Sequence, residues 1–323
     1  MLRDRLISAA VLISVISGLL FLDANYPLVG VPGLWLLPAI VFFAFGTAWD
    51  ISRIFKSSGH AIRRVPGIGG AVLVAMSTAI PMAWPLAGSE YPADCPVGVL
   101  GWIVLAAVAA IFWVLIVEMK NYGPETKGAI ECTLAGIFVS LYVGVPMALL
   151  VAIRMLGGDT STAVSGDISE GVSTANWGLA ALLTMIATTK SADTGAYFVG
   201  RMFGRRKLIP RLSPGKTREG ALGGVVAATI VAFVCLKWLF PWIENGDLSV
   251  PSRAPAWGCL VLGPVLGVSG IVGDLAESLV KRDSGVKDSG NLLPGMGGVW
   301  DVTDSLIAAV MPAFVCFAAG VAG

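Results

Sequence analysis

Blocks of about twenty apolar residues, separated by short polar segments, recur along the whole chain. A helix of that length crosses a hydrocarbon core of roughly 30 Å. Composition agrees, because 13% of the 323 residues are charged and 56% are hydrophobic, whereas soluble domains carry about 25% charged residues. We therefore expect an all-α polytopic membrane protein.

The apolar blocks predict about nine transmembrane helices. These lie near residues 6–22, 28–49, 67–88, 97–117, 128–153, 177–199, 220–240, 255–279 and 301–320. We interpret the first block as a span, with a signal peptide as the minor alternative, because no small-residue cleavage motif follows it.

The distribution of basic residues predicts the orientation. Lys and Arg concentrate on the cytoplasmic side of membrane proteins. All but Arg154, Lys190, Lys237 and Arg253 fall at the start of the chain or in segments that would share one side, namely 50–66, 118–127, 200–219 and 280–300. We expect a cytoplasmic N-terminus, an outside C-terminus and residence in a bacterial inner membrane, with the site facing the cytoplasm.

We expect one integral domain with two regions. Residues 1–176 would hold about five spans and an outer polar loop at 157–176. Residues 177–323 would form the C-terminal region, whose cytoplasmic loops at 200–219 and 280–300 carry the candidate chemistry.

Histidine and cysteine chemistry is largely excluded. His60 is the only histidine, and the five cysteines form no C-x-x-C pair. A Ser-His-Asp triad, a Cys-His pair and a zinc site are therefore not expected. Carboxylates, Lys, Arg, hydroxyls and backbone groups remain.

Charged residues inside the apolar blocks indicate a functional site. Lys190, Asp193, Asp274 and Glu277 lie within such blocks, where charges are costly unless they pair, bind an ion or line a wet cavity. A structural alternative is that Lys190 pairs with Asp193, and Glu277 with Lys281 one helical turn on.

Two carboxylate pairs favour a magnesium site. Asp274 and Glu277 are three residues apart, as are Asp301 and Asp304, so each pair shares one face of a helix. Mg²⁺ prefers carboxylate, water and phosphate oxygens. Between the pairs lies LPGMGG, 293–298, whose glycines allow backbone amides to approach a phosphate.

Basic residues in the same segments complete the parts of a phosphoryl- or nucleotidyl-transfer site. A nucleoside triphosphate at the membrane surface is the expected substrate. The basic residues are Lys281, Arg282, Lys287, Arg205, Arg206, Lys207, Lys216 and Arg218.

The C-terminal segment resembles phosphatidate cytidylyltransferases, the CDP-diacylglycerol synthases. Their signature S-x-x-K-R-x4-K-D-x-G-x-x-hydrophobic-P-x-H-G-G-x-x-D-R-x-D is matched from Ser278 to Asp304, after a similar GDLAES at 273–278. The matching positions are Ser278, Lys281, Arg282, Lys287, Asp288, Gly290, Pro294, Gly297, Gly298, Asp301 and Asp304.

A second segment resembles the same family. The stretch 192–224 is similar to D-x-x-A-Y-x-x-G-x-x-F-G followed by S-P-x-K-T-x-E-G. It matches at Asp193, Ala196, Tyr197, Gly200, Phe203, Gly204, Ser213, Pro214, Lys216, Thr217, Glu219 and Gly220.

The resemblance implies condensation of CTP with phosphatidic acid to give CDP-diacylglycerol and pyrophosphate, with Mg²⁺ as cofactor and membrane lipid, not nucleic acid, as partner. A second, monovalent cation and a homodimer are left open. The implied metal ligands are Asp274, Asp301 and Asp304, with Asp288 and Glu277 as supplementary ligands. The implied catalytic residues are Lys281, Arg282, Lys287 and Asp288. The implied substrate-binding residues are Asp193, Ser213, Lys216, Thr217, Glu219, Gly297 and Gly298.

Two positions depart from the family pattern. Met296 replaces the usual histidine and Val302 the usual arginine. A phosphate monoester is anionic at neutral pH and attacks without a histidine base, so we expect rate and substrate preference to change more than the reaction. The alternatives are another CTP-dependent lipid-phosphate cytidylyltransferase, a polyprenol kinase, an ion-coupled transporter or a catalytically inactive relative.

Overall fold

The computed structural model describes residues 2–89, 91–92, 95–123, 128–157, 172–246, 248 and 254–321. It divides into two compact units. The first comprises Met1–Val151 and Val280–Thr303, and the second Ala152–Leu279 and Asp304–Gly323. Helices α6, α11 and α12 continue from one unit into the other. The predicted regions and the single integral domain stay predictions.

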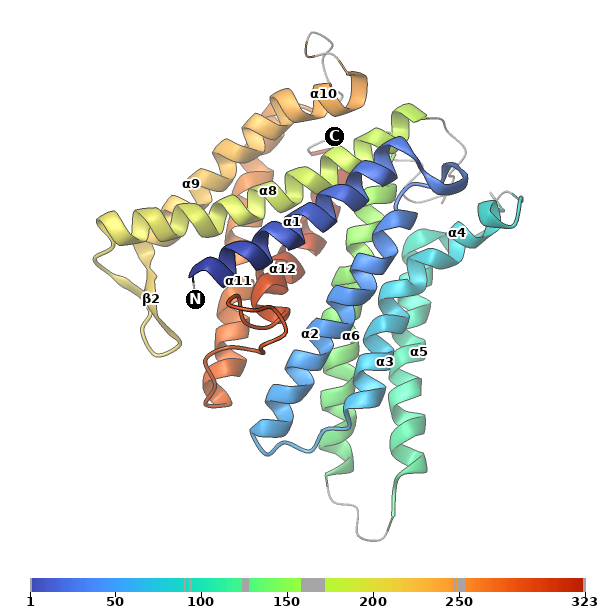
Figure 1. Cartoon of the computed structure of the whole chain (residues 1–323), viewed down its shortest axis with the longest axis vertical. Coiled ribbons are helices and arrows are strands. Elements are labelled where there is room, and N and C mark those ends of the chain that lie inside the picture. Colours follow the sequence, from blue (N-terminus) through green and yellow to red (C-terminus); the bar gives the residue numbers. More distant parts are fainter. Residues whose placement is uncertain are drawn as a thin grey trace. The chain divides into compact units, whose positions relative to one another are not determined.

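The first unit begins with α1 (Leu2–Asn25) and continues with helices of membrane-spanning length (Figure 1). Its other elements are η1 (Leu28–Gly30), η2 (Leu34–Leu36), α2 (Leu37–Ser57), α3 (Arg64–Ala75), η3 (Met76–Thr78), α4 (Ala79–Leu86), α5 (Gly98–Lys120) and α6 (Ala129–Met155).

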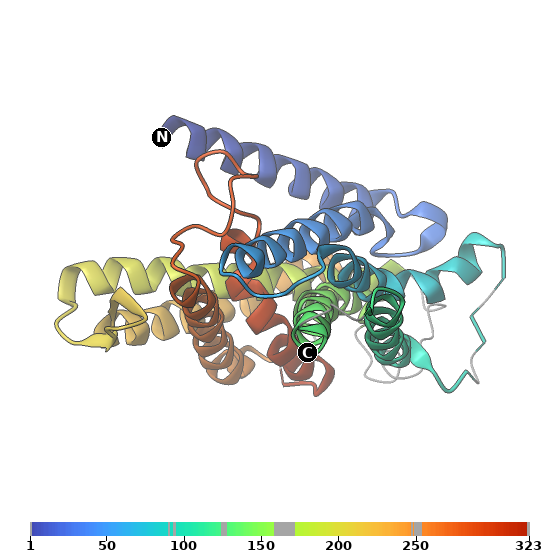
Figure 2. The same ribbon diagram turned by 90° about the horizontal axis from the view of Figure 1, so that it is seen from below.

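Small residues bring helices of the first unit close together. A Cβ added at Gly67 would lie 3.4 Å from Gly136 of α6, and one at Gly144 would lie 2.8 Å from the carbonyl of Ala71. Ser140 Oγ of α6 donates to the carbonyl of Gly67 in α3 at 3.2 Å. Such packing replaces the hydrophobic driving force, which is absent between helices in lipid, and α2, α3, α5 and α6 lie side by side (Figure 2).

The second unit contains α8 (Val172–Phe203), a short hairpin and the helices that follow it. The strands β1 (Lys207–Ile209) and β2 (Ser213–Thr217) pair antiparallel, with Lys207 opposite Thr217. The other elements are α9 (Arg218–Val234), the π-helical segment η4 (Cys235–Leu239), α10 (Phe240–Asn245), η5 (Ala256–Gly258), α11 (Cys259–Asp283) and α12 (Trp300–Ala318).

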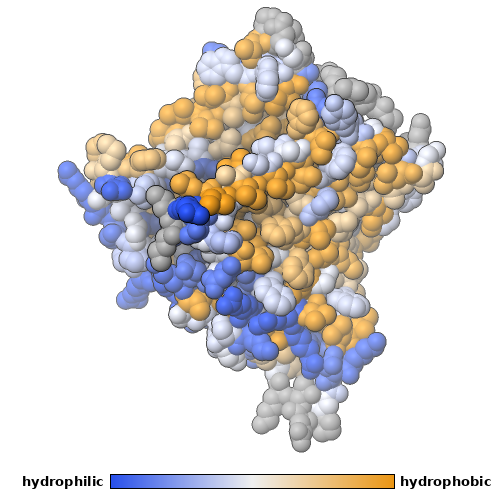
Figure 3. Space-filling view, viewed as in Figure 1, coloured by the Kyte–Doolittle hydropathy of each residue, from blue (hydrophilic) through white to orange (hydrophobic). Residues whose placement is uncertain are grey.

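The polytopic all-α class is confirmed by eight helices in the described residues that are long and apolar enough to span a membrane. Helix α8, the sixth predicted span, is not among them, so the count of nine and the orientation stay predictions. Residues 172–176, assigned to the outer loop, belong to α8, and 158–171 lie outside the described residues. Apolar residues cover much of the surface in Figure 3, as lipid contact requires.

Three aromatic rings form the core where α8, α10 and α12 meet. Trp177, Phe240 and Phe317 are each at most 2% exposed, and the ring centroids of Trp177 and Phe240 are 5.6 Å apart. Phe317 lies 5.8 Å from Trp177 and 6.4 Å from Phe240. Each ring therefore contacts the other two.

Truncation of this core should destabilise the protein. Phe240→Ala removes two ring contacts and leaves a cavity, so we expect the free energy of unfolding to fall by about 3 kcal/mol. Thermal unfolding in detergent measures the change. Phe112→Ala, at a side chain 59% exposed, is the matched control, and an equal loss in both variants would contradict the assignment of the core.

Candidate functional site

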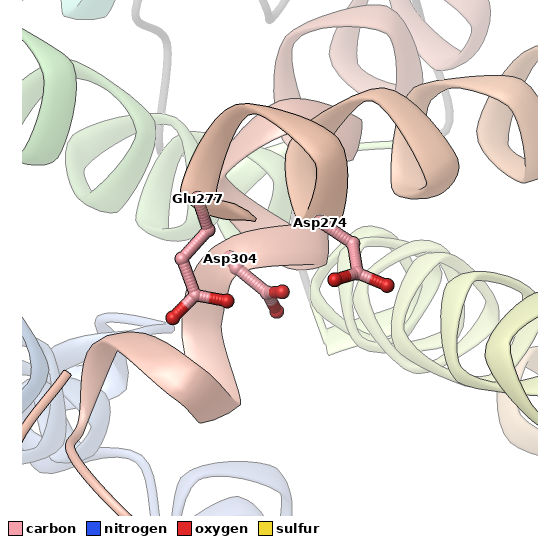
Figure 4. Close-up of side chains that lie close together, drawn as sticks. All are labelled: Asp274, Glu277 and Asp304. Atoms are coloured by element: carbon pink, nitrogen blue, oxygen red, sulfur yellow. The ribbon is translucent and has the colours of Figure 1, made fainter. Parts of the chain in front are cut away.

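Three carboxylates of the second unit converge at one point. Asp274 and Glu277 lie on α11 and Asp304 on α12, and one oxygen of each lies within 4.8 Å of the others (Figure 4). Glu277 is 3% and Asp304 6% exposed. Like charges this close and this buried repel one another, and a bound cation or a shared proton relieves that repulsion. The oxygen donors suit a hard divalent ion.

Close packing of the two helices creates this convergence. A Cβ added at Gly273 would lie 2.8 Å from Ala308 of α12 and would also meet the backbone of Asp304. With glycine there, Asp274 and Glu277 reach Asp304 across a short gap. The i, i+3 spacing places both carboxylates of α11 on the side that faces α12.

Lysines partly balance this negative charge. Lys216 Nζ lies 2.6 Å from Asp274 Oδ2. Lys190 Nζ lies 2.7 Å from Ser305 Oγ and 3.6 Å from Asp193 Oδ2, as the structural alternative for Lys190 and Asp193 predicted. Ser305 Oγ in turn donates to Asp193 Oδ2 at 3.2 Å. Acidic and basic groups of α8, β2, α11 and α12 thus lie next to one another.

A pocket of about 570 Å³ opens beside Asp274, within the size range of small-ligand sites. Its polar lining includes Asp193, Tyr197, Arg201, Lys216, Thr217 and Asp274. Arg201 donates to the hydroxyl of Tyr197 at 2.9 Å. The pocket therefore offers two cations, an aromatic ring and the edge of the carboxylate cluster.

The β-hairpin holds Lys216 at this pocket. Thr217 caps α9 by accepting a hydrogen bond from the Gly220 N–H at 3.1 Å, and an N-cap of this kind stabilises a helix by about 1 kcal/mol. Glu219 accepts from the N–H groups of Arg205 and Arg206, each at 3.1 Å. Two of the predicted substrate-binding residues, Thr217 and Glu219, thus shape the hairpin, and Ser213 begins its second strand.

In the first unit, Asp301 organises the glycine-rich segment. Lys281 Nζ lies 2.7 Å from Asp301 Oδ1. Asp301 Oδ2 accepts from the N–H of Gly298 at 2.6 Å and from Ser289 Oγ at 2.8 Å. Lys281 therefore pairs with Asp301, and the geometry leaves the role of Asp301 as a metal ligand a prediction.

Left-handed backbone shapes the turn at 293–298. Gly297 has φ +104° and Gly295 φ +75°, conformations that glycine adopts without strain. The N–H of Gly297 donates to the carbonyl of Leu293 at 3.1 Å, and the N–H of Leu293 donates back to the carbonyl of Gly297 at 3.0 Å. The turn is also held by α1, since Arg5 Nε donates to the carbonyl of Gly295 at 2.6 Å.

The other predicted catalytic residues are exposed. Arg282, at the end of α11, and Lys287 and Asp288, in the loop that follows, point mainly to solvent. Solvent, and therefore a dissolved nucleotide, can reach all three side chains. Sequence reasoning missed Asp50, a buried residue of α2 that contacts the same loop, because no local pattern marks a contact across about 250 positions.

Comparison with known proteins places these features in a family. The model of the "Cytidylyltransferase family" matches residues 3–319. A phosphatidate cytidylyltransferase of Haemophilus influenzae is 44% identical over 41% of this chain and 44% of its own length. Uncharacterized protein YnbB of Escherichia coli is 43% identical over 39% of this chain and 38% of its own.

A phosphatidate cytidylyltransferase of Chlamydia muridarum is 31% identical over 82% of this chain and 76% of its own length. The chain thus spans less than half the length of the first two relatives but most of the third. The family model extends over nearly every residue. It includes α1 to α6, which contain none of the family motifs found in the sequence. The chain belongs to the cytidylyltransferase family.

Proposed function

We propose that this protein condenses CTP with phosphatidic acid, giving CDP-diacylglycerol and pyrophosphate. The observation that carries the proposal is the convergence of Asp274, Glu277 and Asp304 within 4.8 Å beside a pocket lined by Lys216 and Arg201. Family membership and the names of two of the relatives support the same reaction.

The reaction is an in-line displacement at phosphorus. An oxygen of the lipid phosphate forms a bond to the α-phosphorus of CTP as the bond from that phosphorus to the bridging oxygen of pyrophosphate breaks. The lipid phosphate is already anionic at neutral pH, so no side chain has to remove a proton from it. Met296, in place of the family's histidine, is compatible with this chemistry.

The carboxylate cluster fits Mg²⁺, and Asp274, Glu277 and Asp304 would hold it, with Asp301 and Asp288 as further proposed ligands. When bound, the ion would neutralise charge on the attacking and leaving oxygens. The packing of α11 on α12 positions these three carboxylates.

The remaining predicted residues bind substrate in this proposal. Lys216, Thr217, Asp193 and Ser213 form the nucleotide pocket, with Glu219 holding its hairpin. Lys281, Arg282 and Lys287 neutralise phosphate charge, and the backbone at Gly297 and Gly298 approaches the phosphates. A position at the ends of membrane helices suits a substrate whose acyl chains stay in lipid.

Loss of one buried carboxylate should abolish the reaction. Purified protein incubated with phosphatidic acid, α-labelled CTP and Mg²⁺ should label the lipid and release pyrophosphate. Asp304→Asn should lower the rate at least about 100-fold, because the variant loses a carboxylate that would hold the cation stabilising the transition state. Release of CDP in place of pyrophosphate would identify a kinase. Asp283→Asn, exposed on the same α11, is the control and should retain activity.

Asp301 is tested in the same assay. Asp301→Asn keeps the size of the side chain but removes the charge that faces Lys281, so labelling should fall strongly. Full Mg²⁺-dependent labelling by this variant would show that Asp301 is not a metal ligand.

Lys216 should contribute to nucleotide binding. Lys216→Ala removes the cation that now neutralises Asp274, and we expect kcat/KM for CTP to fall about 100-fold, the loss of about 2.7 kcal/mol of interaction with a phosphate. Initial rates at varied CTP measure it. Arg211→Ala, exposed in the turn of the same hairpin, should change the rate little, and equal losses in both would point to a general effect of charge.

We also propose that the site faces the cytoplasm of a bacterial inner membrane, on the basis of the distribution of Lys and Arg. In a variant freed of native cysteines, a cysteine at Ser57, the exposed last residue of α2 at its predicted cytoplasmic end, should react with a membrane-impermeant maleimide only after cell lysis. One at Ser89 should react in intact spheroplasts. The reverse pattern would invert the orientation.

A further inference from the structure

A buried carboxylate from α2 holds the segment that carries the family signature. Asp50 is 1% exposed. Its Oδ2 accepts hydrogen bonds from the N–H of Val299 at 2.6 Å and from the N–H of Trp300 at 3.2 Å. All three residues belong to the first unit. The contact therefore ties α2 to the start of α12, although the bonded residues are about 250 positions apart in the sequence.

The two N–H groups are those that a helix leaves without an intrahelical partner at its N-terminus. A Ser, Thr, Asp or Asn at the N-cap position accepts from the N–H groups two or three residues further on, and the N–H groups of Val299 and Trp300 likewise need an acceptor. Here the residues before Trp300 are Gly297, Gly298 and Val299, and none has a side chain that can accept. Asp50 supplies the missing cap from another helix, and its negative charge is favoured at this end of α12.

Glycines of the signature make room for this carboxylate. A Cβ added at Gly290 would meet Asp50 Oδ1, and one at Gly298 would meet Asp50 Oδ2. Larger residues at either position would push the carboxylate away from the backbone it binds. The absence of a side chain at these two glycines therefore makes room for the Asp50 carboxylate.

Two carboxylates divide the backbone donors at the start of α12 between them. The N–H of Gly298 donates to Asp301, and the N–H groups of Val299 and Trp300 donate to Asp50. Arg53, one turn after Asp50 in α2, interacts electrostatically with Asp50. The segment from Gly297 to Asp301 is thus fixed at successive residues before any nucleotide arrives.

We propose that Asp50 is a positioning residue that preorganises Gly297, Gly298 and Asp301 for the triphosphate of CTP. The inference rests on the function proposed above. A loop that is ordered in advance costs less binding energy to order when the ligand arrives. Without the cap, the affinity for CTP falls, while phosphatidic acid, whose acyl chains lie in lipid, is less affected.

The experiment uses the full chain in detergent with two substitutions. Asp50→Asn keeps the shape and one acceptor but removes the charge, and Asp50→Ala removes the cap. Asp23→Asn is the matched control, because Asp23 is also 1% exposed and also accepts from a backbone N–H, but from that of Gly33 at 2.8 Å and not from residues 297–302.

Two readouts separate a positioning role from a structural one. Without nucleotide, amide hydrogens of residues 297–302 should exchange with deuterium at least about 10-fold faster in both Asp50 variants than in the native protein or in Asp23→Asn. KM for CTP should rise about 10-fold in Asp50→Asn and more in Asp50→Ala, with KM for phosphatidic acid changed less than about 2-fold.

Each outcome decides the proposal. Unchanged exchange at 297–302 in folded Asp50→Asn would overturn the cap. Faster exchange with an unchanged KM for CTP would overturn the positioning role. If the native protein fails to label lipid from CTP but the Asp50 variants still show faster exchange at 297–302, the proposed function is wrong and the capping role of Asp50 is supported. If Asp50→Ala does not fold, Asp50→Asn, which is nearly isosteric, carries the test.

Discussion

The cost of burying like charges at the end of membrane helices is the constraint on which the rest of the site depends. Asp274, Glu277 and Asp304 bring oxygens within 4.8 Å of one another, and two of the three side chains are almost fully buried. Such an arrangement is stabilised by compensating positive charge or by a shared proton. Lys216 supplies part of it at Asp274, and a divalent ion fits the remaining oxygen donors.

Close helix packing brings these charged residues together. Closely packed helices need small residues at their contacts, and Gly273 lets α11 approach α12 at Asp304. The hairpin of β1 and β2 then carries Lys216 to the same carboxylates. The residues that allow close helix packing and those that neutralise charge are therefore neighbours, and they lie in the two segments that resemble the family.

Much of this could be predicted from the sequence, for local reasons. Apolar blocks predict helices because the backbone must satisfy its own hydrogen bonds in lipid, and the i, i+3 spacing of Asp274 and Glu277 predicts a shared face. Spacing alone could not separate the roles of Asp301 and Asp304. Asp301 binds Lys281, Ser289 and Gly298, whereas Asp304 joins the carboxylates of α11. The role of Asp50 could not be predicted from the sequence, because its hydrogen-bond partners, Val299 and Trp300, lie about 250 residues further along the chain.

The central claim is that the buried carboxylates form a divalent-cation site, and the most direct measurement is cation binding to the metal-free protein without substrates. Titration with Mn²⁺, followed by electron paramagnetic resonance, should show saturable binding that Mg²⁺ displaces and that Asp304→Asn weakens at least about 10-fold. Binding of equal strength in the native protein and in Asp304→Asn would contradict the account, because the ion would then lie elsewhere.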